Sequence, residues 1–369
     1  MSATRTPGRW WTPEGFVEGV CTHGARVVSL EPGAVDGTAP TFLPAPVDLH
    51  VHGGGGRDAM DGEAAIRGML VLHAAHGTGA ALATSVTAPH ADTARFLDAV
   101  AAVVDEPRPD EATLLGAHLE GPFINPEKLG AQPPHAAAPD AGRLEAWFST
   151  GVVRAITFAP EIDPGGLVLD ACRRHGVRAQ LGHTLCGWAE AHRALEAGCG
   201  VTHLYNAMGG VGHRGGGTAT AALAFAAHAE IITDGLHVDR AAFEAARRAI
   251  PGLYAITDAT AAAGMPDGRY ALGSLSVEKR GERVLLPDGT LAGSCLTQRR
   301  SVGVLRGWGL DWHAIGAMTS AVPARWIDAP EVGRIDEGAR AHWLEIDGER
   351  VAAHWLAGVR RPWDVADAR

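Results

Sequence analysis

Metal-binding side chains recur at the ends of strand-like runs in this chain. His50 and His52 lie two residues apart in one apolar run. Because alternate residues of a strand point to the same face, both imidazoles aim the same way. Further candidates close later runs of the same kind: Glu120, His183, His203 and Asp258. Imidazoles and carboxylates that converge from separate strands can hold a divalent ion that activates water. The pattern predicts a hydrolytic metal enzyme.

Short apolar runs alternate with alanine-rich, helix-like stretches through most of the chain. The expected strands are 47–52, 81–86, 113–120, 152–158, 178–183, 200–205, 230–234 and 253–258. The expected helices are 62–76, 91–104, 140–149, 165–175, 187–197, 217–228 and 239–249. This alternation predicts an α/β fold, a (β/α)8 TIM barrel with a parallel sheet. The candidate ligands would then lie at the C-terminal ends of strands, which is the face that carries the active site in this barrel.

The two ends of the chain have a different pattern. Residues 1–44 and 334–369 contain short strand-like runs, and we expect them to pair as a small β-domain. Residues 45–333 would then form the catalytic barrel. Within that range, residues 269–292 resemble a hairpin that leaves the barrel after the eighth strand and turns at Asp288-Gly289.

Composition narrows the class of partner. The chain has 369 residues, is 46% hydrophobic and carries a net charge of −10, without a basic run, so nucleic acid is not an expected partner. Its five cysteines form no Cys-x-x-Cys pair and favour a reducing cytoplasm. The N-terminus lacks the apolar core of a signal peptide, and the most apolar later stretch contains His228 and Glu230. We expect a cytoplasmic protein that does not enter a membrane and acts on a small molecule.

Longer strings of sequence are more specific than the ligand pattern. They are His118-Leu119-Glu120-Gly121-Pro122, Gly182-His183-Thr184, Thr202 to Met208, Asp234 to Asp239, Thr257 to Thr260, and Gly289 to Ser294. In this order they resemble the N-acetylglucosamine-6-phosphate deacetylase family, from about residue 44 to residue 340. The opening Asp48-x-His50-x-His52 is similar to that of the wider amidohydrolase superfamily.

This resemblance implies a metal-dependent hydrolase that converts N-acetylglucosamine 6-phosphate to glucosamine 6-phosphate and acetate. Glu120, His183 and His203 would hold the main ion. His50 and His52 would hold a second ion with Glu120 as the bridge, although some family members use one ion. The cofactor is therefore expected to be one or two divalent ions, zinc first, with iron, manganese and cobalt as alternatives.

The resemblance also implies roles around the substrate. Asp258 would handle protons and His237 would polarise the acetyl carbonyl. Asn206 and Ala207 would contact the sugar phosphate, and Arg214 would reach the phosphate in a neighbouring subunit, which implies a homodimer. The remaining substrate contacts would come from Ala131, Gln132, Asp234, His237, Leu291, Ala292 and Gly293.

The required chemistry is consistent with these residue types. Water bound to a divalent metal loses its proton at about pH 7. Asp258 would take a proton from the attacking water and later deliver it to the leaving amine. His237, in whichever neutral tautomer the substrate needs, would donate a hydrogen bond to the developing oxyanion. Strand 152–158 contains no lysine, so a modified lysine cannot bridge two ions there, which points away from dihydroorotase and hydantoinase.

Two loops depart from the family pattern. Gln132 stands where the family usually has a substrate-contacting histidine, and Gly215-Gly216 follows Arg214 where Glu-Pro is usual. Both departures lie on the substrate side, so the catalytic type is better determined than the substrate.

Two rival hypotheses stay open at this point. The enzyme could deacetylate another N-acetyl amino sugar, phosphorylated or not, or another N-acyl compound. Alternatively, the chain could be a non-catalytic protein that keeps the amidohydrolase fold. A lone histidine commonly serves only a hydrogen bond in a protein core, but that interpretation explains poorly why so many ligand types share one barrel face. The intact Asp258 also argues against the non-catalytic alternative.

We expect protein purified without chelator to contain one or two divalent ions per chain, because five potential ligands share one strand-end face. Elemental analysis measures this directly. A metal-free preparation with full hydrolytic activity would contradict the expectation.

Overall fold

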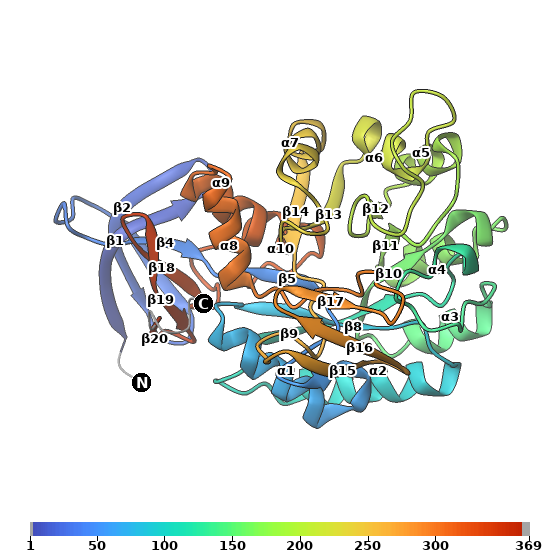
Figure 1. The fold of residues 1–369 in the computed structure, drawn as a ribbon. Helices are drawn as coiled ribbons and strands as arrows, with labels where there is room; N and C mark the ends of the chain where they lie inside the picture. Colours follow the sequence, from blue (N-terminus) through green and yellow to red (C-terminus); the bar gives the residue numbers. More distant parts are fainter. Residues whose placement is uncertain (1–2, 364–369) are drawn as a thin grey trace.

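A computed structural model describes residues 3–363 of the chain. Six parallel strands form one sheet in the order β12-β11-β10-β9-β8-β5 (Figure 1). Their bounds are β5 Val47–Val51, β8 Ala80–Ser85, β9 Thr113–Glu120, β10 Val153–Phe158, β11 Arg178–Leu181 and β12 Gly200–Val201. A second parallel pair consists of β13 His228–Ile232 and β14 Gly252–Ile256.

Backbone hydrogen bonds join the six-stranded sheet and the β13–β14 pair into one curled parallel sheet. Leu204, just after β12, donates its N–H to the carbonyl of Glu230 at 2.8 Å. On the other side, Asp258 donates to the carbonyl of His50 at 3.0 Å, which joins the end of β14 to β5. The strands are buried on both faces, as expected of a parallel sheet covered by helices. The predicted amidohydrolase barrel fold is confirmed.

The helices follow the strands as the alternation predicts. They are α1 Glu63–Ala75, α2 His90–Asp105, α3 Ala141–Phe148, α4 Leu167–His175, α5 Trp188–Glu196, α6 Thr218–Phe225, α7 Arg240–Ala249, α8 Gln298–Gly307, α9 Trp312–Gly316 and α10 Val322–Trp326. Short turns of other helix types are η1 Ala59–Asp61, η2 Pro126–Lys128, η3 Pro160–Ile162 and the π-turn η4 Ala317–Ala321. Helix α2 shows the packing rule, because Phe96, Val100 and Val103 recur at three- and four-residue spacing and are buried.

One strand is shorter than the sequence predicts. We expect a strand over 200–205, but β12 ends at Val201. The backbone turns left-handed at His203 (φ 27°) and Tyr205 (φ 80°), which a strand cannot accommodate. The predicted extension is therefore wrong, and the turn carries one of the candidate ligands.

The two ends of the chain meet in one seven-stranded sheet, ordered β20-β19-β18-β4-β1-β2-β3. Its strands are β1 Thr4–Thr12, β2 Gly15–His23, β3 Val27–Pro32, β4 Thr41–Pro44, β18 Trp343–Asp347, β19 Arg350–Leu356 and β20 Val359–Pro362. Trp10 stacks on Phe42 with ring centroids 4.1 Å apart, and Trp343 meets Trp10 edge-on at 5.3 Å. The domain boundaries at 44/45 and 333/334 stay a prediction, and residues 1–2 and 364–369 of that domain lie outside the described residues.

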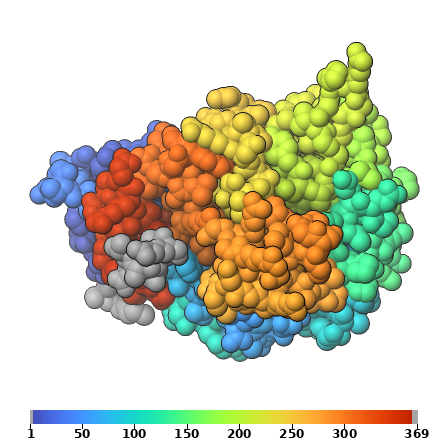
Figure 2. Space-filling model, in the orientation of Figure 1, coloured from blue at the N-terminus to red at the C-terminus, as the bar shows by residue number. Residues whose placement is uncertain are grey.

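The segment after β14 makes three strands where we expect a single hairpin. Strands β15 Gly268–Leu272, β16 Leu275–Arg280 and β17 Arg283–Leu285 are antiparallel. Elsewhere in the chain, β6 Gly53–Gly54 and β7 Arg57–Asp58 form a separate antiparallel pair. The extra turn arises because Gly273 (φ 53°) and Gly281 (φ 58°) adopt left-handed conformations that glycine tolerates. The expected turn at Asp288-Gly289 is present, with Leu286 donating to Thr290 at 2.8 Å. Figure 2 shows this orange segment on the molecular surface.

Within residues 3–363, no helix combines the length and the apolar character needed to cross a bilayer.

Candidate metal centre and active site

Three predicted ligands from the ends of three strands of one sheet converge on one point at the barrel mouth. Glu120 is the last residue of β9, while His183 and His203 lie two residues beyond β11 and β12. Glu120 Oε1 lies 3.1 Å from His183 Nε2 and 2.9 Å from His203 Nε2, and the two nitrogens are 3.2 Å apart. All three side chains are buried. We call these residues the main ligand set.

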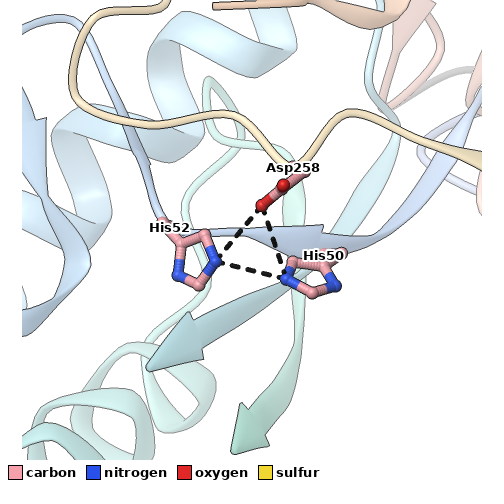
Figure 3. A group of neighbouring side chains, drawn as sticks. All are labelled: His50, His52 and Asp258. Atoms are coloured by element: carbon pink, nitrogen blue, oxygen red, sulfur yellow. Dashed lines mark hydrogen bonds and ion pairs between the residues drawn. The ribbon is translucent and has the colours of Figure 1, made fainter. Parts of the chain in front are cut away.

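A second set adjoins the first. His50, His52 and Asp258 converge from β5 and the end of β14 (Figure 3). The two Nε2 atoms are 3.2 Å apart, and Asp258 Oδ1 lies 3.5 Å from that of His50 and 3.3 Å from that of His52. Glu120 faces this second ligand set as well, with its Oε2 3.1 Å from His52 Nε2. Its carboxylate therefore stands between the two sets.

The geometry of the main ligand set fits a divalent ion. A tetrahedral ion with bonds of 2.0–2.1 Å keeps its ligands about 3.3 Å apart. The separations of 2.9–3.2 Å in this set lie close to that value. Three protein ligands with a fourth position open towards solvent are typical of a catalytic zinc site. The second ligand set has similar spacing, 3.2–3.5 Å, and can hold another ion of the same kind.

Three of these residues have a left-handed backbone. His183 (φ 49°), His203 (φ 27°) and Asp258 (φ 52°) lie in a region that costs roughly 1–3 kcal/mol for residues other than glycine. Each follows the end of a parallel strand, where the chain must turn away from the barrel.

Backbone carbonyls orient two of the imidazoles. His183 Nδ1 lies 2.8 Å from the carbonyl of Lys128, and His52 Nδ1 lies 3.2 Å from that of Thr84. A carbonyl only accepts, so Nδ1 carries the proton in each ring and Nε2 keeps its lone pair for an ion.

Two carboxyl groups of the site are held in the ionised form. Burial opposes ionisation of Glu120, but the neighbouring imidazoles of His50 and His183 outweigh it and hold the pKa of Glu120 well below its usual value. Burial likewise opposes ionisation of Asp258, and contacts with His52 and His50 lower its pKa. An ionised Asp258 can accept a proton, as a general base must.

His237 is fixed by Asp234. Asp234 Oδ2 lies 2.6 Å from His237 Nδ1, and its Oδ1 accepts the backbone N–H groups of Leu236 and His237 at 2.8 and 2.9 Å. Burial favours the neutral ring, but the hydrogen bond and charge of Asp234 overcome it and raise the pKa of His237. Because Nδ1 donates to Asp234, Nε2 can donate to a substrate only when the ring is charged. A donor at this position would therefore have to be an imidazolium, not the neutral ring expected from the sequence, and the role of His237 stays a prediction.

A cavity of about 430 Å³ opens beside both ligand sets. Its lining includes the predicted contacts Ala131, Gln132, Asn206, Ala207, His237, Leu291 and Gly293, together with Glu127, Lys128, Leu272 and Thr290. Three other predicted contacts are not among the lining residues. Arg214 is exposed on the loop after β12, Asp234 lies behind His237, and Ala292 is buried.

Gln132 has a contact that the sequence does not indicate. Its side-chain amide donates to Oε2 of Glu120, and its carbonyl accepts the backbone N–H of Thr87 at 2.6 Å. A substrate-contacting role for Gln132 stays a prediction. The side chain supports the carboxylate that faces both ligand sets.

Several supporting residues are missing from the sequence prediction. Glu230 lies 3.0 Å from His50 Nδ1, and it is joined by Gln180 and Tyr254. Burial opposes ionisation of Glu230, but His50 outweighs it and lowers its pKa. A glutamate inside an otherwise apolar strand is the signal that could have identified it, because a buried charge requires partners.

Known proteins are similar in sequence to most of this chain. No protein-family model matches it. An N-acetylgalactosamine-6-phosphate deacetylase from Escherichia coli O157:H7 is 34% identical over 368 residues, covering 95% of this chain and 97% of the relative. An N-acetylglucosamine-6-phosphate deacetylase from Bacillus subtilis is 34% identical over 78% of this chain and 75% of its own length.

The chain belongs to the N-acetylglucosamine-6-phosphate deacetylase family. Solved structures of family members agree with this assignment. The Thermotoga maritima enzyme superposes with a TM-score of 0.88 at 27% identity, over 96% of this chain and 98% of that one. A Mycobacterium smegmatis mutant enzyme in complex with N-acetyl-D-glucosamine-6-phosphate gives 0.89 at 29% identity, over 98% and 99% of the two chains. The chain is accordingly a metal-dependent amide hydrolase.

Asp258→Asn should retain the fold and the ion of the main ligand set but lose kcat by a factor on the order of 10²–10⁴, the usual contribution of a positioned acid or base. Steady-state kinetics with parallel metal analysis tests this. Asp98→Asn, at an exposed position of α2, is the matched control and should behave as wild type. An Asp258→Asn enzyme with nearly unchanged kcat would reduce Asp258 to a hydrogen-bond acceptor.

The pH profile of kcat/KM should fall on the alkaline side as His237 loses its proton. Asp234 raises the pKa of His237, so the charged form persists above the ordinary histidine range of about 6.5. In Asp234→Asn the charge of Asp234 is lost and only Asp258 still opposes the lowering by burial, so this alkaline limb should move to lower pH. The acid limb, if set by Asp258, should stay in place. An alkaline limb that does not move would assign it to a different group.

Proposed function

We propose that this enzyme hydrolyses the acetamide of N-acetylglucosamine 6-phosphate to glucosamine 6-phosphate and acetate. The observation that carries the proposal is the convergence of both ligand sets, Asp258 and His237 on a single sugar-sized cavity. Family membership over nearly the whole chain supports the same reaction. The convergence of two complete sets of potential ligands also argues against the non-catalytic alternative.

The chain's own residues would divide the work as follows. Glu120, His183 and His203 would hold the main ion, and His50 and His52 a second one bridged by Glu120. The ions, with zinc as the first choice, would make water nucleophilic at neutral pH and polarise the carbonyl. Asp258 would belong to the second ligand set and also face the attacking water.

Proton transfer is assigned to Asp258. Its carboxylate would accept a proton from water as the water attacks the acetyl carbon, and then donate that proton to the departing amine. The amide carbon–nitrogen bond breaks in this step, and acetate and the free amino sugar leave. Charged His237 would donate from Nε2 to the carbonyl oxygen as negative charge develops there.

A second candidate substrate has a specific basis. The Escherichia coli relative, which matches this chain over 97% of its own length, is named for N-acetylgalactosamine 6-phosphate. The two sugars differ at one ring carbon, so the catalytic groups would serve either. The choice would rest with the loops that line the sugar, including 128–134 and 290–293.

We propose that Arg214 reads the phosphate from a second copy of the chain in a homodimer. Arg214 is exposed on the loop between β12 and α6 and does not line its own cavity. In Figure 2 the yellow-green part of the chain protrudes from the molecule. Large apolar side chains are exposed nearby: Leu185 at 42%, Trp188 at 48%, Val211 at 63% and Phe225 at 49%. A surface of this kind favours self-association.

Location in the cytoplasm stays part of the proposal. All five cysteines are free and buried in the structure, which suits a reducing compartment.

We expect a higher kcat/KM for N-acetylglucosamine 6-phosphate than for N-acetylglucosamine, and Arg214→Ala should remove most of this preference. A guanidinium can grip phosphate in a bidentate manner, which the alanine variant cannot. The assay compares both sugars and N-acetylgalactosamine 6-phosphate in wild type, Arg214→Ala and the exposed control Arg95→Ala.

The outcomes separate the hypotheses. Equal rates for the two N-acetylglucosamine forms in the wild type would contradict the phosphate assignment. Faster hydrolysis of the galactose epimer would select the second candidate. A preference that survives in Arg214→Ala but disappears in Lys128→Ala would assign the phosphate to Lys128, the cation on the cavity lining.

A further inference from the structure

Glu230 connects the two ligand sets although it belongs to neither. It lies on β13, completely buried. Its Oε2 lies 3.0 Å from Nδ1 of His50, a member of the second ligand set. The same oxygen accepts the backbone N–H of His203, a member of the main ligand set, at 3.2 Å. One atom therefore contacts both halves of the candidate metal centre.

The other oxygen of Glu230, Oε1, has partners that belong to neither ligand set. Oε1 accepts from the side-chain amide of Gln180 at 2.8 Å and lies 3.4 Å from the hydroxyl of Tyr254. Tyr254 also donates to the carbonyl oxygen of Gln180 at 3.0 Å, which fixes the orientation of that amide. Both oxygens of Glu230 are thus met by donors, as a buried carboxylate requires.

This arrangement determines which nitrogen of His50 is available to an ion. A carboxylate accepts hydrogen bonds and does not donate them, so His50 must carry its proton on Nδ1. Its Nε2 then keeps a lone pair, directed towards the Nε2 of His52 and the carboxylate of Asp258. A histidine ligand supported in this way by a carboxylate is more basic and better oriented.

Glu230 supports the main ligand set in a different way. His203 has a left-handed backbone with φ of 27°, which is unfavourable for histidine. The hydrogen bond from its N–H to Glu230 helps to stabilise that conformation. The main ligand set, however, also contains Glu120 and His183, whose side chains form no hydrogen bond or ion pair with Glu230 within residues 3–363.

A third metal site at Glu230 is not supported. His118 lies close enough to His50 and Glu230 to complete a set of three potential ligands. Both of its ring nitrogens already have partners, the carbonyl of Leu49 at 3.0 Å and the hydroxyl of Thr157 at 2.8 Å. Neither is left to bind an ion, so Glu230 acts as a support.

We propose that Glu230 is a positioning residue that makes binding of a second ion favourable by orienting His50. The proposal rests on the metal centre of the proposed function and not on its substrate. It predicts unequal effects, because the side chain of His50 depends on Glu230 while the main ligand set is touched only through the backbone of His203.

The test is a titration of the chelator-treated protein with Zn²⁺ and with Co²⁺. Calorimetry and competition with a chelator measure the affinity for each ion. Wild type should bind two ions. In Glu230→Gln the affinity for the weaker ion should fall about 10–100-fold, the usual effect of losing such a support. The tighter ion should change much less. Tyr254→Phe, which leaves the Glu230–His50 contact in place, is the matched control and should keep both ions.

A double-mutant cycle separates orientation of His50 from a general effect on folding. His50→Asn should weaken the second ion by itself, and adding Glu230→Gln should then cost no more than about two-fold further. Thermal unfolding of each metal-free protein monitors the fold. If Glu230→Gln does not fold, Glu230→Asp keeps the charge but shortens the reach to His50, and the same selective loss is expected.

Three results would overturn the proposal: a wild type that binds one ion, equal weakening of both ions in the Glu230 variants, or full additivity with His50→Asn. None of these measurements uses a substrate. A protein that fails to hydrolyse any amino sugar would contradict the proposed function while leaving the role of Glu230 intact.

Discussion

The carboxylate of Glu120 is the point around which the molecule is organised. Four imidazole nitrogens surround it, from His50 at 3.4 Å, His52 at 3.1 Å, His183 at 3.1 Å and His203 at 2.9 Å. So many polar groups buried together are unfavourable unless opposite charge compensates them. The arrangement therefore demands a scaffold that brings several strand ends to one place, and a parallel barrel does so because all its C-terminal ends open on the same face.

Hydrogen bonds away from the ligands hold that mouth in register. Asp48 accepts from the hydroxyl of Thr257 at 2.7 Å, which connects β5 to the end of β14 beside Asp258. The hydroxyl of Thr84 accepts a hydrogen bond of 2.9 Å from the backbone N–H of Val51, the residue of β5 between His50 and His52. A site of this kind tolerates errors of only about 0.5 Å, so contacts behind the ligands matter as much as the ligands themselves.

The substrate side is built from loops, yet it is coupled to the metal side. The carbonyl of Lys128 orients His183, while the side chain of the same residue lines the cavity. Gln132, four residues later, donates to Glu120. A change in this loop therefore affects both sugar recognition and ligand geometry.

The sequence alone indicated the class of the fold, the four histidines of the ligand sets and Glu120, whereas the place of Asp258 in the second ligand set came from the structure. Alternating apolar strands and helices have strong periodicity, and His50-x-His52 needs only the two-residue repeat of a strand to share a face. The tertiary structure decided what depends on distant partners. Glu230 lies 180 residues from His50 along the chain, and their pairing follows from closure of the barrel between β14 and β5. The 2.6 Å contact of His237 with Asp234 and the left-handed turn that ends β12 are local, but neither leaves a mark in the hydrophobic pattern. The Glu230–His50 contact has no local pattern at all, because it arises only when separate strands are brought together.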